Sequence, residues 1–106
     1  MELKIYWTDF AKKELRKIFN YYKKRASSNV AQTLVISITK EATKLEKNPD
    51  IGQKEELLED SSKEYRYFVH KSYKIIYWIN SGNNSVEIFD VFDSRQNPLK
   101  IKRSKK

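Results

Sequence analysis

The first apolar residues of the chain alternate with polar ones, and the pattern then changes to a helical period. Leu3, Ile5 and Trp7 are spaced by two, which predicts a β-strand. Thr8 is suited to cap a following helix, and Asp9 lies in its first turn, where a negative charge favours the helix dipole. The apolar residues of this helix fall on one face: Phe10, Ala11, Leu15, Ile18, Phe19 and Tyr22.

A second amphipathic helix follows a polar break at residues 27–29. The Ser-Ser-Asn sequence of this break can cap a helix N-terminus. The helix should end at Asn48, because the residue before Pro49 avoids the α conformation, and Gly52 then turns the chain. Its apolar stripe consists of Val30, Ala31, Leu34, Val35, Ile38, Ala42 and Leu45.

The remaining chain has the two-residue period of β-strands. Residues 57–58 form a short candidate strand, and residues 65–70 and 73–79 form two longer strands that a tight turn connects. A polar turn at residues 80–84 leads to the last strand, residues 85–92.

The predicted order is β-α-α-β-β-β-β, which is an α+β fold. Two amphipathic helices cannot bury their apolar faces alone, so we expect a helical hairpin packed on one face of a mainly antiparallel sheet. The opposite face would stay at least partly available to a partner. In the last strand, Val86, Ile88 and Phe92 are predicted to face the same way.

The length of 106 residues fits a single domain. We place the domain at residues 1–99 and a basic tail at residues 100–106, whose last few positions we expect to be mobile.

The chain lacks cysteine, a signal-peptide pattern and any run of about 18 apolar residues, which fits a cytoplasmic protein. The net charge of +8 favours an acidic partner, although a lysine-rich surface also serves solubility alone.

Sequence signals of enzymatic chemistry are scarce. The two glycines, Gly52 and Gly82, lie too far apart for a phosphate-binding loop, and the lone His70 cannot supply a histidine metal site. We therefore expect neither a metal nor a cofactor. Asp90 and Asp93, at the end of the last strand, are interpreted as turn and ion-pair residues.

Three residues are candidates for binding an anion. Arg66 lies among aromatic residues and either forms a surface ion pair, with Asp90 as a candidate partner, or binds phosphate or carboxylate through its planar guanidinium. His70 lies on the same strand face as Arg66, so both could contact one ligand; the alternative is an exposed histidine at the strand end. Arg95 follows the last strand in an irregular segment, where functional residues are common.

Five segments of the chain carry a family resemblance: the first strand and helix, Leu45 to Pro49 with Gly52, Tyr65-Arg66, Tyr73 to Tyr77, and Val91 to Pro98. In this order they resemble the RelE/ParE superfamily of toxins from type II toxin–antitoxin modules. The resemblance covers nearly the whole chain. The long helices and the turn at residues 48–52 look more like ParE than like RelE.

This resemblance implies a small basic toxin that a cognate antitoxin holds inactive. RelE-like members cut mRNA in the ribosomal A site without a metal, whereas ParE-like members have no nuclease activity and inhibit DNA gyrase. Arg66 and Arg95 match the two arginine positions of the superfamily, and Lys54 lies where family lysines occur. No tyrosine or histidine follows Arg95, which argues against a nuclease.

We therefore expect a ParE-like inhibitor of DNA gyrase, with these target-binding residues: Lys54, Arg66, His70, Arg95, Lys100, Lys102 and Arg103. The first alternative is a RelE-like, ribosome-dependent mRNA endoribonuclease (an mRNA interferase), in which Arg66 and Arg95 would be catalytic. The second is an inactive relative that only binds its antitoxin. Each of these three hypotheses is compatible with a homodimer. The gyrase hypothesis assumes that the cations near the last strand are not engaged in internal ion pairs.

Overall fold

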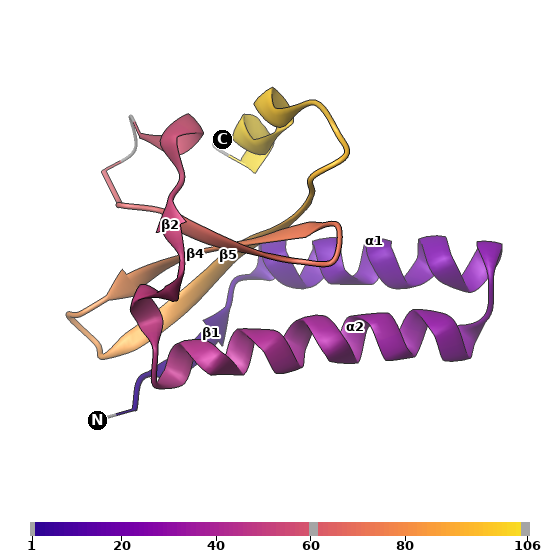
Figure 1. Cartoon of the computed structure of the whole chain (residues 1–106), viewed down its shortest axis with the longest axis horizontal. Coiled ribbons are helices and arrows are strands. Elements are labelled where there is room, and N and C mark those ends of the chain that lie inside the picture. The colour runs from indigo at the N-terminus through magenta and orange to yellow at the C-terminus, as the bar shows by residue number, and fades with distance from the viewer. Residues whose placement is uncertain (1, 60–61, 105–106) are drawn as a thin grey trace.

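The computed structural model describes residues 2–59 and 62–104, which form a helical hairpin packed on a five-stranded sheet (Figure 1). The strand order is β1-β5-β4-β3-β2, with β1 parallel to β5 and the other pairs antiparallel. The helices and strands are β1 (Lys4–Trp7), α1 (Asp9–Arg25), α2 (Ser28–Ala42), β2 (Gln53–Lys54), β3 (Arg66–His70), β4 (Tyr73–Asn80) and β5 (Ser85–Asp93). The predicted α+β class and helical hairpin are confirmed.

Short 3-10 helices complete the described chain: η1 (Thr43–Glu46), η2 (Pro49–Ile51), η3 (Glu56–Leu58) and η4 (Pro98–Ser104). The predicted end of the second helix at Asn48 is wrong, because α2 stops earlier and the chain tightens into η1, where Leu45 is buried. The main core lies between the hairpin and the sheet. Its buried residues are Ala11, Ile38, Ala42, Leu45, Tyr73, Ile75, Tyr77, Val86, Ile88 and Val91.

Both long helices begin where the sequence predicts. The Thr8 hydroxyl accepts a hydrogen bond from the Ala11 amide at 3.1 Å, and the Ser27 hydroxyl accepts one from the Val30 amide at 3.1 Å. These contacts satisfy amides of the first turn that no helical carbonyl can reach. The local sequence therefore fixes the start of each helix.

A β-bulge in β5 changes the side-chain pattern of the last strand. The β4–β5 register shifts between Ile76 and Tyr77, which leaves Phe89 as the extra residue. After the bulge, Val91 joins the core under the helices and Phe92 joins a second cluster. The prediction that Phe92 shares a face with the earlier apolar residues of this strand is therefore wrong.

The chain itself covers part of the second sheet face. The expected strand at residues 57–58 is instead η3, and η4 lies against it (Figure 1). Both supply apolar side chains that bury neighbouring sheet residues, so this face is less open than predicted. The buried residues of this second cluster are Leu58, Tyr65, Ile76, Phe92 and Ile101.

The segment predicted as a basic tail packs onto the domain as far as the structure describes it. Ile101 in η4 has no exposed surface, whereas Lys100 and Lys102 on either side of it are exposed. Ile101 thus helps to anchor the segment, while the charges of Lys100 and Lys102 on either side of it stay exposed. The last positions, for which mobility was expected, include residues 105–106, which lie outside the described residues.

Tyr77 connects the loop between the hairpin and β2 to the sheet. Its hydroxyl donates to the Pro49 carbonyl at 2.6 Å and accepts from the Gly52 amide at 2.9 Å. Burial raises the pKa of this phenol, which keeps it a hydrogen-bond donor. Gly52 is required here because a β-carbon would lie 2.5 Å from the Tyr77 hydroxyl and 2.8 Å from the Tyr67 carbonyl.

Gly52→Ala should lower the free energy of unfolding by about 1–3 kcal/mol, because the added methyl group must displace Tyr77 or the β3 backbone. Gly82→Ala is the matched control, since its β-carbon would meet only the Asn80 side-chain oxygen at 3.3 Å in an exposed turn. Urea unfolding of both variants measures the difference. Equal stabilities would show that the Tyr77 contact does not restrict this position.

Candidate functional site

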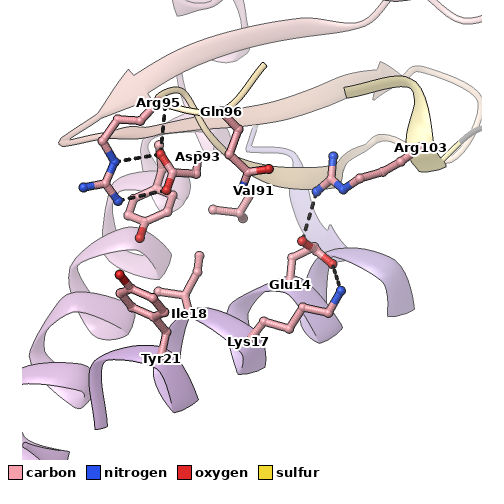
Figure 2. Close-up of a pocket in the computed structure, with 10 residues that line it drawn as sticks. Glu14, Lys17, Ile18, Tyr21, Val91, Asp93, Arg95, Gln96 and Arg103 are labelled. Carbon is pink, nitrogen blue, oxygen red and sulfur yellow. Dashed lines mark hydrogen bonds and ion pairs between the residues drawn. The ribbon is translucent and has the colours of Figure 1, made fainter. Parts of the chain in front are cut away.

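A cleft of about 340 Å³ lies between α1, the end of β5 and the C-terminal segment (Figure 2). One wall comes from the middle of α1, and the other comes from the start of β4, the end of β5 and the residues that follow β5. Ten residues line it: Glu14, Lys17, Ile18, Tyr21, Tyr73, Val91, Asp93, Arg95, Gln96 and Arg103. Two of the predicted target-binding arginines, Arg95 and Arg103, therefore meet at one site.

Arg95 forms an ion pair with Asp93 but remains accessible. Its Nε donates to Asp93 Oδ1 at 2.9 Å and its Nη2 donates to Oδ2 at 2.8 Å. This bidentate contact holds the pKa of Asp93 below its ordinary value. A hydrogen bond from Tyr73 and, to a lesser extent, the contact with Arg95 lower the pKa of Tyr22. The Arg95 side chain is nevertheless 57% exposed. A partner can therefore reach one side of this guanidinium.

Arg103 is bound on several sides by the protein itself. Its guanidinium donates to both carboxylate oxygens of Asp90, at 3.0 and 3.1 Å, and to Glu14 Oε1 at 2.9 Å. The rings of Phe10 and Phe92 lie 5.3 and 5.0 Å from its central carbon. We call Glu14, Asp90 and Arg103 the C-terminal ion-pair cluster. Its geometry indicates a structural role for Arg103 rather than direct target binding. The assumption that the cations near the last strand form no internal ion pairs is therefore wrong for both Arg95 and Arg103.

Asp90 is the most unusual titratable group of this cluster. It has no exposed surface, and burial raises the pKa of its carboxyl to about 6. Arg103 opposes the rise, and the nearby Glu14 carboxylate adds to it. The second Glu14 oxygen lies 3.2 Å from Lys17 Nζ without a hydrogen bond from any described residue. The Arg103 guanidinium therefore lies between two largely buried carboxylates, and Lys17 provides a second counter-charge for Glu14.

Arg66 and Lys54 lie away from this cleft, at the β2–β3 edge. Arg66 donates to the Gly52 carbonyl at 2.9 Å and lies 3.3 Å from Glu64, so its predicted pairing with Asp90 is wrong. Asp90 is two strands away and already bound by Arg103. Lys54 is opposite Arg66 in the register and is exposed.

His70 packs beneath α2 instead of lying exposed at a strand end. Its Nε2 is 3.0 Å from the Ser37 hydroxyl, and its Nδ1 is 3.9 Å from Glu41. It shares a strand face with Arg66, but the two side chains have different partners and do not form one anion site. The predicted residues thus divide among three places, and among them only Arg95 and Arg103 line the cleft.

Sequence reasoning missed the α1 wall of the cleft. Glu14 interrupts the apolar face of the helix between Ala11 and Ile18, at the three- and four-residue spacings that place all three together. A charged residue at such a position needs a counter-charge, and that was the available signal.

In the part of the chain that the structure describes, no group of three or more acidic or histidine ligands could hold a metal ion. No described helix has the length and apolar character needed to cross a bilayer.

The family model of the ParE toxin of the type II toxin–antitoxin system, parDE, matches residues 5–98. The chain belongs to the ParE toxin family. A solved structure described as "Chromosomal ParDE TA system from P. aeruginosa" is similar over 87% of this chain and 96% of that chain, with a TM-score of 0.70 and 14% identity. At this identity the similarity supports the fold. A comparison with curated protein sequences gives no significant match.

Membership of the ParE family implies a cognate antitoxin as partner. The family match ends at Pro98, the first residue of η4. Most of η4, with Ile101 and Arg103, therefore lies beyond the matched region. The C-terminal ion-pair cluster joins this additional segment to two matched elements of the ParE toxin, α1 and β5.

Arg103→Met should lower the free energy of unfolding by about 3–5 kcal/mol, because it leaves the buried Asp90 without its counter-charge. Arg95→Met is the matched control: it removes a similar bidentate pair at an exposed position and should change stability little. Urea unfolding at neutral pH compares them. Equal losses would contradict a special structural role for Arg103.

The stability contribution of Asp90 should depend on pH. Because its folded pKa of about 6 is above the unfolded value, this contribution is fully present below about pH 4 and is lost as the pH rises through 6. The stability of the wild type relative to Asp90→Asn should therefore fall by about 1–3 kcal/mol between about pH 4 and 7. Urea unfolding across this range measures it, and a difference that rises with pH would refute the raised pKa.

Proposed function

We propose that this ParE-family toxin is a non-enzymatic inhibitor of DNA gyrase, acting in the cytoplasm and neutralised by its cognate antitoxin. The observation that carries the proposal is the ParE family match over residues 5–98. The cleft supports it, since two exposed cations, Lys17 and Arg95, line it together with apolar side chains and two carboxylates. Such a surface fits an acidic region of a larger protein or its complex with DNA.

The positions of the two arginines disfavour the RelE-like alternative. Arg66 pairs across the sheet with Tyr77, whereas Asp93, which holds Arg95, pairs with Tyr73. These positions of β4 are about 13 Å apart along the strand, and β4 lies between β3 and β5. Stabilising one phosphate requires charges within hydrogen-bond distance of it, so this arrangement does not favour a shared catalytic role.

Four exposed cations, two that line the cleft and two on η4, are available for target binding. Arg95 and Lys17 have side chains that are 57% and 67% exposed, and Lys100 and Lys102 are exposed on η4. Arg103, in contrast, is engaged by the protein itself. We therefore assign Arg95, Lys100 and Lys102 to target contact and Arg103 to structure.

Purified toxin should block DNA supercoiling by gyrase and leave mRNA uncut on translating ribosomes. Arg95→Gln should weaken the inhibition at least about fivefold, because it removes an exposed cation from the proposed contact. Lys47→Gln, which removes one charge at an exposed position after η1, is the matched control and should inhibit like the wild type. Cleavage of mRNA in the A site, with gyrase unaffected, would overturn the proposal in favour of the RelE-like alternative.

The antitoxin is proposed to contribute an acidic, partly disordered segment that folds along the helices. A second groove of about 400 Å³ lies on the other side of Tyr73, between the hairpin and the β3–β4 turn, and Tyr22, Val30 and Leu34 line it. Tyr73 borders both grooves, so one extended segment could contact the two in succession. Its carboxylates would pair with the exposed cations Lys17 and Arg95, while its apolar residues are buried in the grooves.

Antitoxin binding should weaken by about tenfold or more between about 50 and 500 mM salt, since exposed charges are screened over this range. Isothermal titration of the toxin with its antitoxin measures this dependence. An affinity that does not change with ionic strength would show that charge contributes little to the complex.

A further inference from the structure

The two sides of η4 have different surroundings. Ile101 and Arg103 point into the protein, the first into the second apolar cluster and the second into the C-terminal ion-pair cluster. Lys100 and Lys102 are exposed. Short 3-10 helices have poor hydrogen-bond geometry and little intrinsic stability, so the inward contacts must hold η4 in place.

Arg103 makes the more specific of these inward contacts. Ile101 gains apolar burial, which is non-directional and tolerates rotation of the segment. The Arg103 guanidinium is instead oriented by the two Asp90 oxygens and by Glu14, and it lies 5.0–5.3 Å from two aromatic rings. A planar group held by several partners fixes both the position and the rotation of the helix that carries it.

We propose that Arg103 is a positioning residue that fixes Lys100 and Lys102 relative to Arg95, so that the three cations contact the target as one surface. This inference rests on the proposed function, because it assigns a role to η4 in target binding. Most of η4 lies beyond the family match, so the family assignment does not by itself imply this role. Each lysine loses side-chain entropy when it binds the target. Holding the backbone of η4 in place before binding lowers the total entropy cost of the contact.

The test is the charge-balanced double variant Asp90→Asn with Arg103→Met, which leaves no buried charge unpaired at position 90. Trypsin cleavage after Lys100 and Lys102, followed by mass spectrometry, should be about tenfold faster than in the wild type because η4 is released. Gyrase inhibition should weaken at least about fivefold. Arg103→Lys, which keeps the charge but not the fork geometry, is a second variant and should give intermediate cleavage rates.

A double-mutant comparison distinguishes the proposed positioning role of Arg103 from a role in stability alone. Replacing both lysines by glutamine should weaken inhibition about fivefold in the wild type but less than about twofold in the Asp90–Arg103 double variant, since the released lysines no longer act with Arg95. Additive losses, or wild-type cleavage rates in the folded variants, would overturn the inference. If the wild type does not inhibit gyrase, the proposed function fails, and the cleavage rates alone decide whether Arg103 holds η4.

Discussion

The structure of this toxin depends on how the fully buried Asp90 is compensated. An unpaired carboxylate at this depth would cost several kcal/mol, and the chain supplies its counter-charge from the last described segment. The same guanidinium binds Glu14 from α1, so one side chain connects the first helix, the last strand and the C-terminal segment. Folding of the body and docking of η4 are therefore coupled, although η4 is short and follows the family-matched region.

Contacts at the junction of β1 and α1 position α1 against β5, whose last residues line the cleft. The Thr8 amide and hydroxyl donate to the carbonyls of Ile88 and Phe89, so the first turn of α1 covers the edge of β5 just beyond β1. Phe89 is the bulged residue and stacks with Phe10. The bulge turns the rest of β5, which directs its later residues toward η4 and the cleft.

Local signals in the sequence predicted the two helices of the hairpin, both helix caps and the order of the main strands along the chain, because each depends on residues within a few positions. The bulge was not predictable, since the apolar pattern continues through Phe89 and only pairing with β4 reveals the extra residue. The site was predicted in part. Arg95 was placed correctly beside β5, but Arg103 was assigned to a tail because its partners lie 13 and 89 residues away in the sequence. All three predicted arginines form internal contacts, so charge alone did not separate candidate binding residues from structural ones.

The central claim is that Arg103 and Asp90 stabilise the fold as a pair. A double-mutant cycle tests it most directly, with the free energy of unfolding measured for the wild type, Asp90→Asn, Arg103→Met and the double variant. The account predicts a coupling energy of about 2–3 kcal/mol, because Arg103→Met leaves Asp90 buried without its counter-charge, whereas the double variant leaves no charge at position 90. A coupling energy below about 0.5 kcal/mol would show that the two residues act independently and would contradict the account.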